Sequence, residues 1–159
     1  MSRKLILLFG LLLAATVIVA AVHLAGQDGV ECMVIESGAG KISVSFEDLT
    51  KETFSGELTD GKGDVTSHSY TGILLKTLLE QKGIDLSGLT GITVRSADNY
   101  SVELTAQEVL QGDKVYLAVT ADRETIPGID PGTPGVQLIV FGDPNSRRCV
   151  RYARFITIQ

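Results

Sequence analysis

The chain is poor in the side chains on which many enzymes depend. Its 159 residues include two histidines, two cysteines and no tryptophan. His68 is the only histidine beyond the apolar N-terminal segment, which leaves little material for a zinc site or a hydrolase triad. No Gly-x-Ser-x-Gly elbow occurs, and Gly38-Ala39-Gly40-Lys41 is followed by Ile42 where a phosphate loop needs Ser or Thr. The sequence therefore argues against zinc enzymes, serine hydrolases and P-loop proteins.

Basic residues are outnumbered in the main part of the chain. Without Arg3 and Lys4, the remaining 12 basic residues face 19 acidic ones, which makes a net charge of −7. A protein with this charge repels phosphate backbones and anionic lipid. We therefore expect no nucleic-acid partner, and no docking on lipid through charge alone.

One long hydrophobic run lies at the N-terminus. Arg3 and Lys4 precede an almost unbroken apolar stretch from Leu5 to Ala25. This stretch exceeds the apolar core of a typical signal peptide, about 7–15 residues, and reaches the roughly 20 residues of a spanning helix. Residues 1–26 are therefore predicted to be a signal peptide or a transmembrane anchor, and both interpretations stay open. Either one places the rest outside the cytoplasm, at the cell membrane or secreted.

Residues 30–159 are long enough for one domain, and short strand patterns dominate them. Strands are predicted over residues 30–36, 41–45, 53–59, 65–70, 91–96, 100–104, 114–121, 136–141 and 147–158. An apolar stripe ending at Gly83 predicts one main helix over 73–82. Capping patterns, Ser45 with Asp48 and Thr105 with Glu108, predict two short helices over 46–51 and 106–111. The predicted fold class is α+β, with a mixed, mostly antiparallel sheet.

Several segments resemble one protein family in their order and approximate spacing. They are Tyr70-Thr71-Gly72-Ile73-Leu74-Leu75, Ala97-Asp98-Asn99-Tyr100-Ser101-Val102, Val115-Tyr116-Leu117-Ala118-Val119, Arg123-Glu124-Thr125-Ile126-Pro127, Gly132-Thr133-Pro134 and Arg148-Cys149-Val150-Arg151-Tyr152. Together they resemble the molybdopterin-binding domain of the sulfite oxidase family, over Glu31 to Ile158. The resemblance implies that family's fold and a pterin cofactor.

The sequence departs from this family where the metal would bind. In catalytic members a cysteine thiolate ligates molybdenum, but the corresponding stretch Phe54–Gly61 has no Cys. Pro131 stands where the family has His, and Gln137 where it has Arg. The resemblance therefore implies molybdopterin or another pterin as a ligand, argues against molybdenum, and assigns no catalytic residue and no metal ligand.

The candidate site residues cluster near the C-terminus. Arg148 and Arg151 match basic residues that lie near the pterin and its phosphate in the family, and Arg147 adds a third charge. Guanidinium groups grip anions through paired N–H donors. Gln137 occupies the position of the family's arginine. The alternative is that Arg147, Arg148 and Arg151 are solvated positions on an edge strand.

The remaining candidates are two cysteines and the histidine. Cys32 and Cys149 lie in the first and last predicted strands, and an oxidising compartment favours a disulfide between them. Two buried free thiols are the alternative. In a third interpretation, Cys149 faces the pocket beside Arg148 and Arg151 with a lowered pKa. His68 is a candidate for the pocket mouth.

The function inferred from these features is binding of a pterin-like or other small anionic ligand, without classical sulfite oxidation. The protein would be membrane-anchored or exported, and an envelope redox system is its expected partner. Two alternatives stay open. One is a molybdenum-cofactor-dependent oxidoreductase, and the other is a ligand-free interaction module of the envelope.

Overall fold

The computed structural model describes residues 32–159, within a compact unit, Glu31–Gln159. The signal peptide or anchor predicted over residues 1–26 lies outside the described residues. No helix within residues 32–159 is long and apolar enough to cross a membrane.

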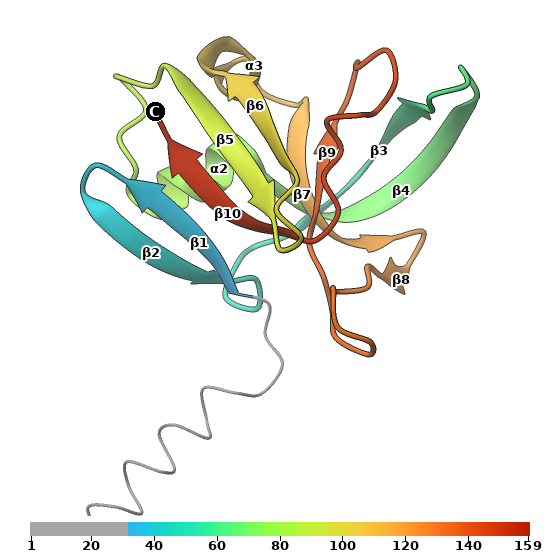
Figure 1. Ribbon diagram of the computed structural model, residues 1–159, viewed down its shortest axis with the longest axis horizontal. Coiled ribbons are helices and arrows are strands. Elements are labelled where there is room, and N and C mark those ends of the chain that lie inside the picture. Colours follow the sequence, from blue (N-terminus) through green and yellow to red (C-terminus); the bar gives the residue numbers. More distant parts are fainter. Residues whose placement is uncertain (1–31) are drawn as a thin grey trace, which may run out of the picture. The chain divides into compact units, whose positions relative to one another are not determined.

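The first of two β-sheets has five strands in the order β2-β1-β10-β5-β6 (Figure 1). These strands are β1 (Cys32–Ser37), β2 (Gly40–Ser45), β5 (Gly91–Ser96), β6 (Ser101–Thr105) and β10 (Ala153–Ile158). The pairing of β1 with β10 is parallel, and the other pairings are antiparallel. The last strand of the chain is therefore a central strand, held between β1 and β5.

The second sheet carries the remaining described strands, and all its pairings are antiparallel. They are β3 (Glu52–Thr59), β4 (Val65–Leu74), β7 (Val115–Ala121), β8 (Glu124–Thr125) and β9 (Gln137–Val140). Both β8 and β9 pair with β7, at different parts of it. In Figure 1 the β3–β4 hairpin extends away from the first sheet, and β8 lies on the same side of the molecule.

The α+β class predicted from the sequence is wrong. The domain is mostly β, with 48% strand and 9% helix, and its two sheets carry two helices within the described residues. These helices are α2 (Leu75–Gln81) and α3 (Ala106–Leu110). One main helix with two short helices is therefore not the architecture of this chain.

The main predicted helix is shorter than expected because its first residues belong to a strand. Ile73 and Leu74 pair with Leu117 and Tyr116 of β7, so the apolar run that suggested a helix face starts as a buried strand. The register shifts at Gly72, where a Cβ atom would lie 2.1 Å from the carbonyl oxygen of Leu117. Glycine is required there by this close approach, and it marks a bulge rather than a helix start.

The short helix predicted over 46–51 is absent, and the reason is visible in its hydrogen bonds. The Ser45 hydroxyl accepts from the amide of Glu47 at 3.3 Å, two residues on, which is a turn rather than a helix cap. The Lys51 ammonium donates to the carbonyls of Phe46 and Leu49 at 2.6 and 3.3 Å. The side chain of Lys51 therefore satisfies the carbonyl of Phe46, which in a helix would accept from the amide four residues on.

The second capping pattern is confirmed. The Thr105 hydroxyl accepts from the amide of Glu108, and the Glu108 carboxylate accepts from the amide of Thr105 at 2.9 Å. This reciprocal pair starts α3 immediately after β6.

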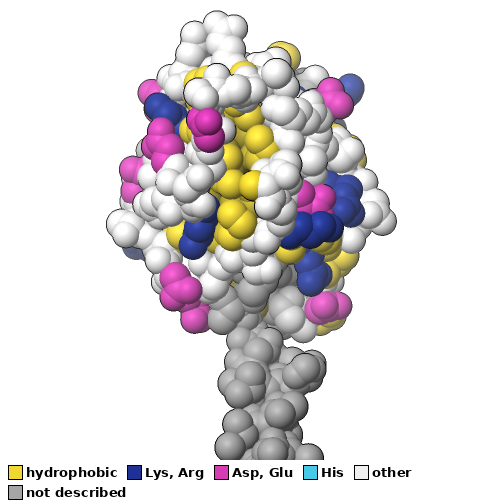
Figure 2. All heavy atoms as spheres, turned by 90° about the vertical axis from the view of Figure 1, so that its left-hand side faces the viewer, with side chains coloured by type: hydrophobic (Ala, Val, Ile, Leu, Met, Phe, Trp, Pro, Cys, Tyr) yellow, Lys and Arg dark blue, Asp and Glu magenta, His cyan; other side chains and the backbone are white. Residues whose placement is uncertain are grey.

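One main hydrophobic core joins the two sheets and both helices, and a second cluster lies in the second sheet. The main core includes Ile35, Val94 and Ile156 from the first sheet, Ile73, Leu117 and Leu138 from the second, Leu75, Leu78 and Leu79 from α2, and Val109 from α3. The second cluster is aromatic: Phe54 stacks on Tyr116 with ring centroids 3.9 Å apart, and Tyr70 and Phe141 lie beside them. Figure 2 shows an elongated strip of hydrophobic side chains on the face to the left of Figure 1.

Candidate functional site

The segment that carries most candidate residues is a loop, not the strand predicted over 147–158. β9 ends at Val140 and β10 begins at Ala153, and Ser146 and Tyr152 have positive φ angles of 49° and 56°. Buried Val150 holds the loop against β9, since its carbonyl accepts from the amide of Leu138 at 2.8 Å. The three arginines are therefore not on an edge strand, and their environments differ.

Arg148 is committed to two carboxylates. Its Nε donates to Asp143 at 2.8 Å, its Nη2 also contacts Asp143, and its Nη1 donates to Glu108 at 2.7 Å. The hydrogen bonds with Asp143 raise the pKa of Arg148 above its ordinary value. Because Glu108 also caps α3, this network ties the loop to the start of that helix. All three guanidinium nitrogens of Arg148 contact a carboxylate of the protein itself, so Arg148 has a structural role here.

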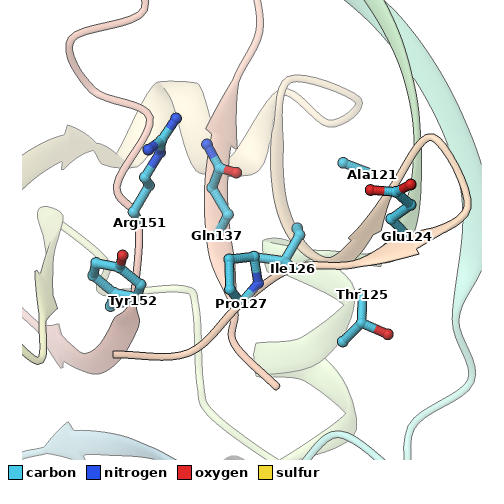
Figure 3. A pocket seen from close by; sticks show the side chains of 8 residues that line it. All are labelled: Ala121, Glu124, Thr125, Ile126, Pro127, Gln137, Arg151 and Tyr152. Carbon is cyan, nitrogen blue, oxygen red and sulfur yellow. The ribbon is translucent and has the colours of Figure 1, made fainter. Parts of the chain in front are cut away.

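Arg151 lines a pocket of about 260 Å³ together with Gln137 and Tyr152. The other lining residues are Ala121, Glu124, Thr125, Ile126 and Pro127. Figure 3 shows the polar ends of Arg151 and Gln137 side by side and directed the same way, with Glu124 beyond Ile126. Among the ion pairs of residues 32–159, none involves Arg151. The pocket therefore has an uncompensated cation at one end and a carboxylate at the other.

The carboxylate end of the pocket is presented by the β7–β8 hairpin. Its two-residue turn is Asp122-Arg123, and both residues have positive φ, 51° and 71°, as a type I′ turn requires. The Asp122 carboxylate is held by the amide of Ser69 at 3.0 Å and by Nδ1 of His68 at 2.7 Å. The His68 hydrogen bond lowers the pKa of Asp122 below its usual range. His68 thus holds the turn that precedes Glu124, and it does not line the pocket.

Cys149 faces β9 and not the pocket. Its side chain is half-buried, and its Sγ accepts from the amide of Val140 at 3.4 Å. Burial raises the pKa of Cys149, so the lowered pKa predicted from its arginine neighbours is wrong. The side chain of Cys32 lies outside the described residues, and the disulfide between Cys32 and Cys149 stays a prediction.

Arg147 is exposed and does not line the pocket. Its carbonyl accepts from the Tyr100 hydroxyl at 2.8 Å, which links the turn after β5 to this loop. A second link runs from the amide of Ala97 to the carbonyl of Tyr152 at 2.9 Å. The backbone of Arg147 therefore contributes to the loop's shape, and its side chain is not part of the pocket.

Of the six candidates, the pocket brings together Gln137 and Arg151. The residues that sequence reasoning missed are Tyr152 and the Glu124–Pro127 segment. A signal for both was present, because both lie in segments that resemble the sulfite oxidase family. What the sequence could not indicate was that the turn at Asp122-Arg123 brings Glu124 to the same pocket as Arg151.

The described residues lack the thiolate with which the resemblance would hold molybdenum, because Phe54–Gly61 has no Cys. No group of three or more His, Cys, Asp or Glu within residues 32–159 is placed to hold a metal ion, and the thiol of Cys149 is directed to β9. At about 260 Å³ the pocket is also smaller than the 300–1,000 Å³ that is typical for drug-sized ligands. The pocket size therefore suits a ligand smaller than a drug-sized molecule.

Comparison with known proteins shows the fold but no family. No family model and no curated protein matches the sequence. Among solved structures, the fold is similar to the sulfane dehydrogenase SoxCD from Paracoccus pantotrophus, with a TM-score of 0.64 and 19% sequence identity. The match covers 80% of this chain and 37% of that one. At this identity the likeness shows the fold alone, and the chain spans little more than a third of that protein's length.

Proposed function

We propose that this domain binds a small anionic or pterin-like ligand in the pocket of Arg151, without classical sulfite oxidation. The observation that carries the proposal is the free guanidinium of Arg151 beside the amide of Gln137 in one pocket. Both residues were singled out because their sequence positions resemble those that contact the pterin. A guanidinium without a carboxylate partner offers paired N–H donors to an anion.

The protein would work as a ligand-binding accessory part of a redox system outside the cytoplasm. The apolar segment of residues 1–26 would place the domain at the membrane beside its partner, or direct its export. Similarity to a dehydrogenase favours a redox setting over a general interaction role. For the same reason a molybdenum-cofactor-dependent oxidoreductase is the second candidate, and the lack of a thiolate in Phe54–Gly61 is the observation against it.

The test uses the full chain purified from a host that makes molybdenum cofactor. Molybdenum is measured by elemental analysis, and released pterin by fluorescence, on the same sample. We expect pterin without stoichiometric molybdenum, lost in Arg151→Ala and kept in Arg154→Ala. Arg154 is a matched control because it is an exposed arginine of β10 that does not line the pocket.

Two other outcomes would overturn the proposal. Stoichiometric molybdenum would establish the oxidoreductase alternative. If no pterin is released, and Arg151→Ala and Arg154→Ala bind inorganic phosphate equally weakly, the pocket of Arg151 has no ligand-binding role. A ligand-free interaction module would then be the better account.

A further inference from the structure

The pocket of Arg151 holds two opposite charges that do not pair with each other. Arg151 lies at one end, and Glu124 lies beyond Ile126 at the other (Figure 3). Within residues 32–159, neither side chain takes part in an ion pair. An anion that binds Arg151 is repelled by Glu124 unless it also carries a positive group that reaches Glu124. The charges of the pocket therefore favour a ligand that carries both signs.

Strand β7 sets the distance between the two ends. Gln137 of β9 lies beside Arg151 (Figure 3) and is opposite Ala118. Glu124 of β8 is opposite Ala121. The register of β7 against β4 shifts between these two positions, so both alanines lie on the side of the aromatic cluster although they are three residues apart. Three residues of a strand span about 10 Å, which is too far for one small ion to reach both ends.

The middle of the pocket is largely apolar. Ile126 is buried, and Pro127 and Tyr152 line the pocket with it. Such a surface offers few hydrogen bonds, but it favours a hydrocarbon chain, because burial of methylene groups is stabilising. At about 260 Å³ the pocket has room for a molecule of amino-acid size.

The backbone that carries Glu124 is held on both sides. Before it, the Asp122 carboxylate accepts from the amide of Ser69 at 3.0 Å. After it, the amide of Ile126 donates to the carbonyl of Val119 in β7 at 2.9 Å. The carboxylate end of the pocket is therefore in place before a ligand binds, which lowers the entropy cost of binding.

We propose that the pocket binds a small zwitterion, an ω-amino carboxylate, in which a short methylene chain separates a carboxylate from an ammonium group. The carboxylate accepts from the guanidinium of Arg151 and the amide of Gln137, and the ammonium donates to Glu124. The methylene groups lie along Ile126 and Pro127. The inference rests on the proposed function, because Arg151 remains the anion-binding residue, and it adds the second charge that the ligand carries.

The experiment measures binding of 6-aminohexanoate, hexanoate, hexylamine and glycine to the full chain by calorimetry. The first three share a hydrocarbon chain and differ in their charged ends. We expect 6-aminohexanoate to bind at least about fivefold more tightly than hexanoate or hexylamine, since each of these lacks one charge-assisted contact. Glycine has both charges but cannot span about 10 Å, and it should bind more weakly by a similar factor.

A charge-neutral variant tests the carboxylate end. Glu124→Gln keeps the shape of the side chain, and we expect it to weaken binding of 6-aminohexanoate about fivefold while it binds hexanoate no more weakly. Glu103→Gln, which changes an exposed carboxyl on β6, is the control and should alter binding of no probe.

The probes separate failure of this inference from failure of the proposed function. If 6-aminohexanoate binds no more tightly than hexanoate, and Arg151→Gln weakens both, Arg151 binds anions without Glu124 and the inference is wrong. The inference is also wrong if 6-aminohexanoate does not bind. If Arg151→Gln changes binding of no probe, the proposed function itself is wrong. The comparison of probes needs no variant, and thermal unfolding of each variant distinguishes a loss of binding from a loss of folding.

Discussion

Two arginines of one loop, three residues apart, have opposite roles in this domain. Arg148 is paired with Asp143 and Glu108 and ties the loop to α3, whereas Arg151 has no carboxylate pair and lines a pocket. Buried Val150 lies between them in the sequence, and its carbonyl accepts from the amide of Leu138 in β9. The sequence pattern alone treated both as equal candidates for an anion site.

The difference shows that the charges around an arginine decide what it can bind. The Asp143 side chain is 7% exposed and the Arg148 side chain 33%, so this pair is largely withdrawn from water. An anion that approached Arg148 would have to displace a carboxylate already in contact with it. Arg151 carries the same group without that competition, and therefore remains available to a ligand.

The largest expected effect is on stability and separates the two arginines. Arg148→Ala leaves the Asp143 carboxylate without its partner, and we expect it to lower the free energy of unfolding by about 2–3 kcal/mol. The partial exposure of Arg148 keeps this value below that of a fully buried pair. Arg151→Ala should change the same quantity by less than about 0.5 kcal/mol, as for other exposed positions. Urea denaturation of both variants measures the difference.

Equal losses in the two variants would contradict this division of roles. Arg148→Lys adds a finer test, because an ammonium cannot contact Asp143 and Glu108 with a rigid fork. It should recover part of the lost stability but not all of it.

Elements with a single strong local signal were predictable from the sequence. The strand over Gly91–Ser96 is found with the predicted bounds, and the Thr105–Glu108 capping box starts α3 as expected. In both cases neighbouring residues suffice: β-branched residues for the strand, and two side chains three positions apart for the cap.

Elements that depend on distant partners were not predictable. Ile73 fits a helix face as well as a buried strand, and only its pairing with Leu117 of β7 decides between them. Likewise, Glu124 reaches the pocket through the turn at Asp122-Arg123. This turn has two positive φ angles but no glycine to predict them. Its Asp122 carboxylate is hydrogen-bonded to His68, which lies 54 residues earlier in the chain. A sequence motif identifies one end of the pocket, and the fold supplies the other.

The second effect is on the pH dependence of stability, and it tests the ion pairs that Arg148 makes with Glu108 and Asp143. Burial raises the pKa of Glu108, but hydrogen bonds from Thr105 and Arg148 outweigh it, and the net pKa lies below the ordinary value of 4.5. A carboxyl with a depressed pKa stabilises the folded state above its unfolded pKa, and this contribution is lost as the pH falls through the folded pKa. We therefore expect the free energy of unfolding to fall below about pH 4.5, and to fall less steeply in Glu108→Gln.

The control for this titration is Glu103→Gln, which changes an exposed carboxyl on β6. It should retain the acid dependence of the unmodified protein. If Glu108→Gln also retains it, the carboxylate of Glu108 does not contribute to stability through Arg148, and the structural role of these ion pairs is weaker than their geometry implies.

The smallest effect concerns Cys149, which lies between the two arginines in the sequence and packs against β9 beside the ion-paired Arg148. Burial raises the pKa of its thiol, and the amide of Val140 contacts its Sγ at 3.4 Å. In a Cys32→Ser protein, we expect a disulfide reagent to react with native Cys149 at least about tenfold more slowly than with the urea-unfolded chain. Equal rates in the native and unfolded proteins would mean that the thiol is accessible to solvent, as the Arg151 side chain is. The same reagent, applied to the unreduced and unfolded native sequence, counts free thiols: none would establish the predicted disulfide between Cys32 and Cys149, and two would exclude it.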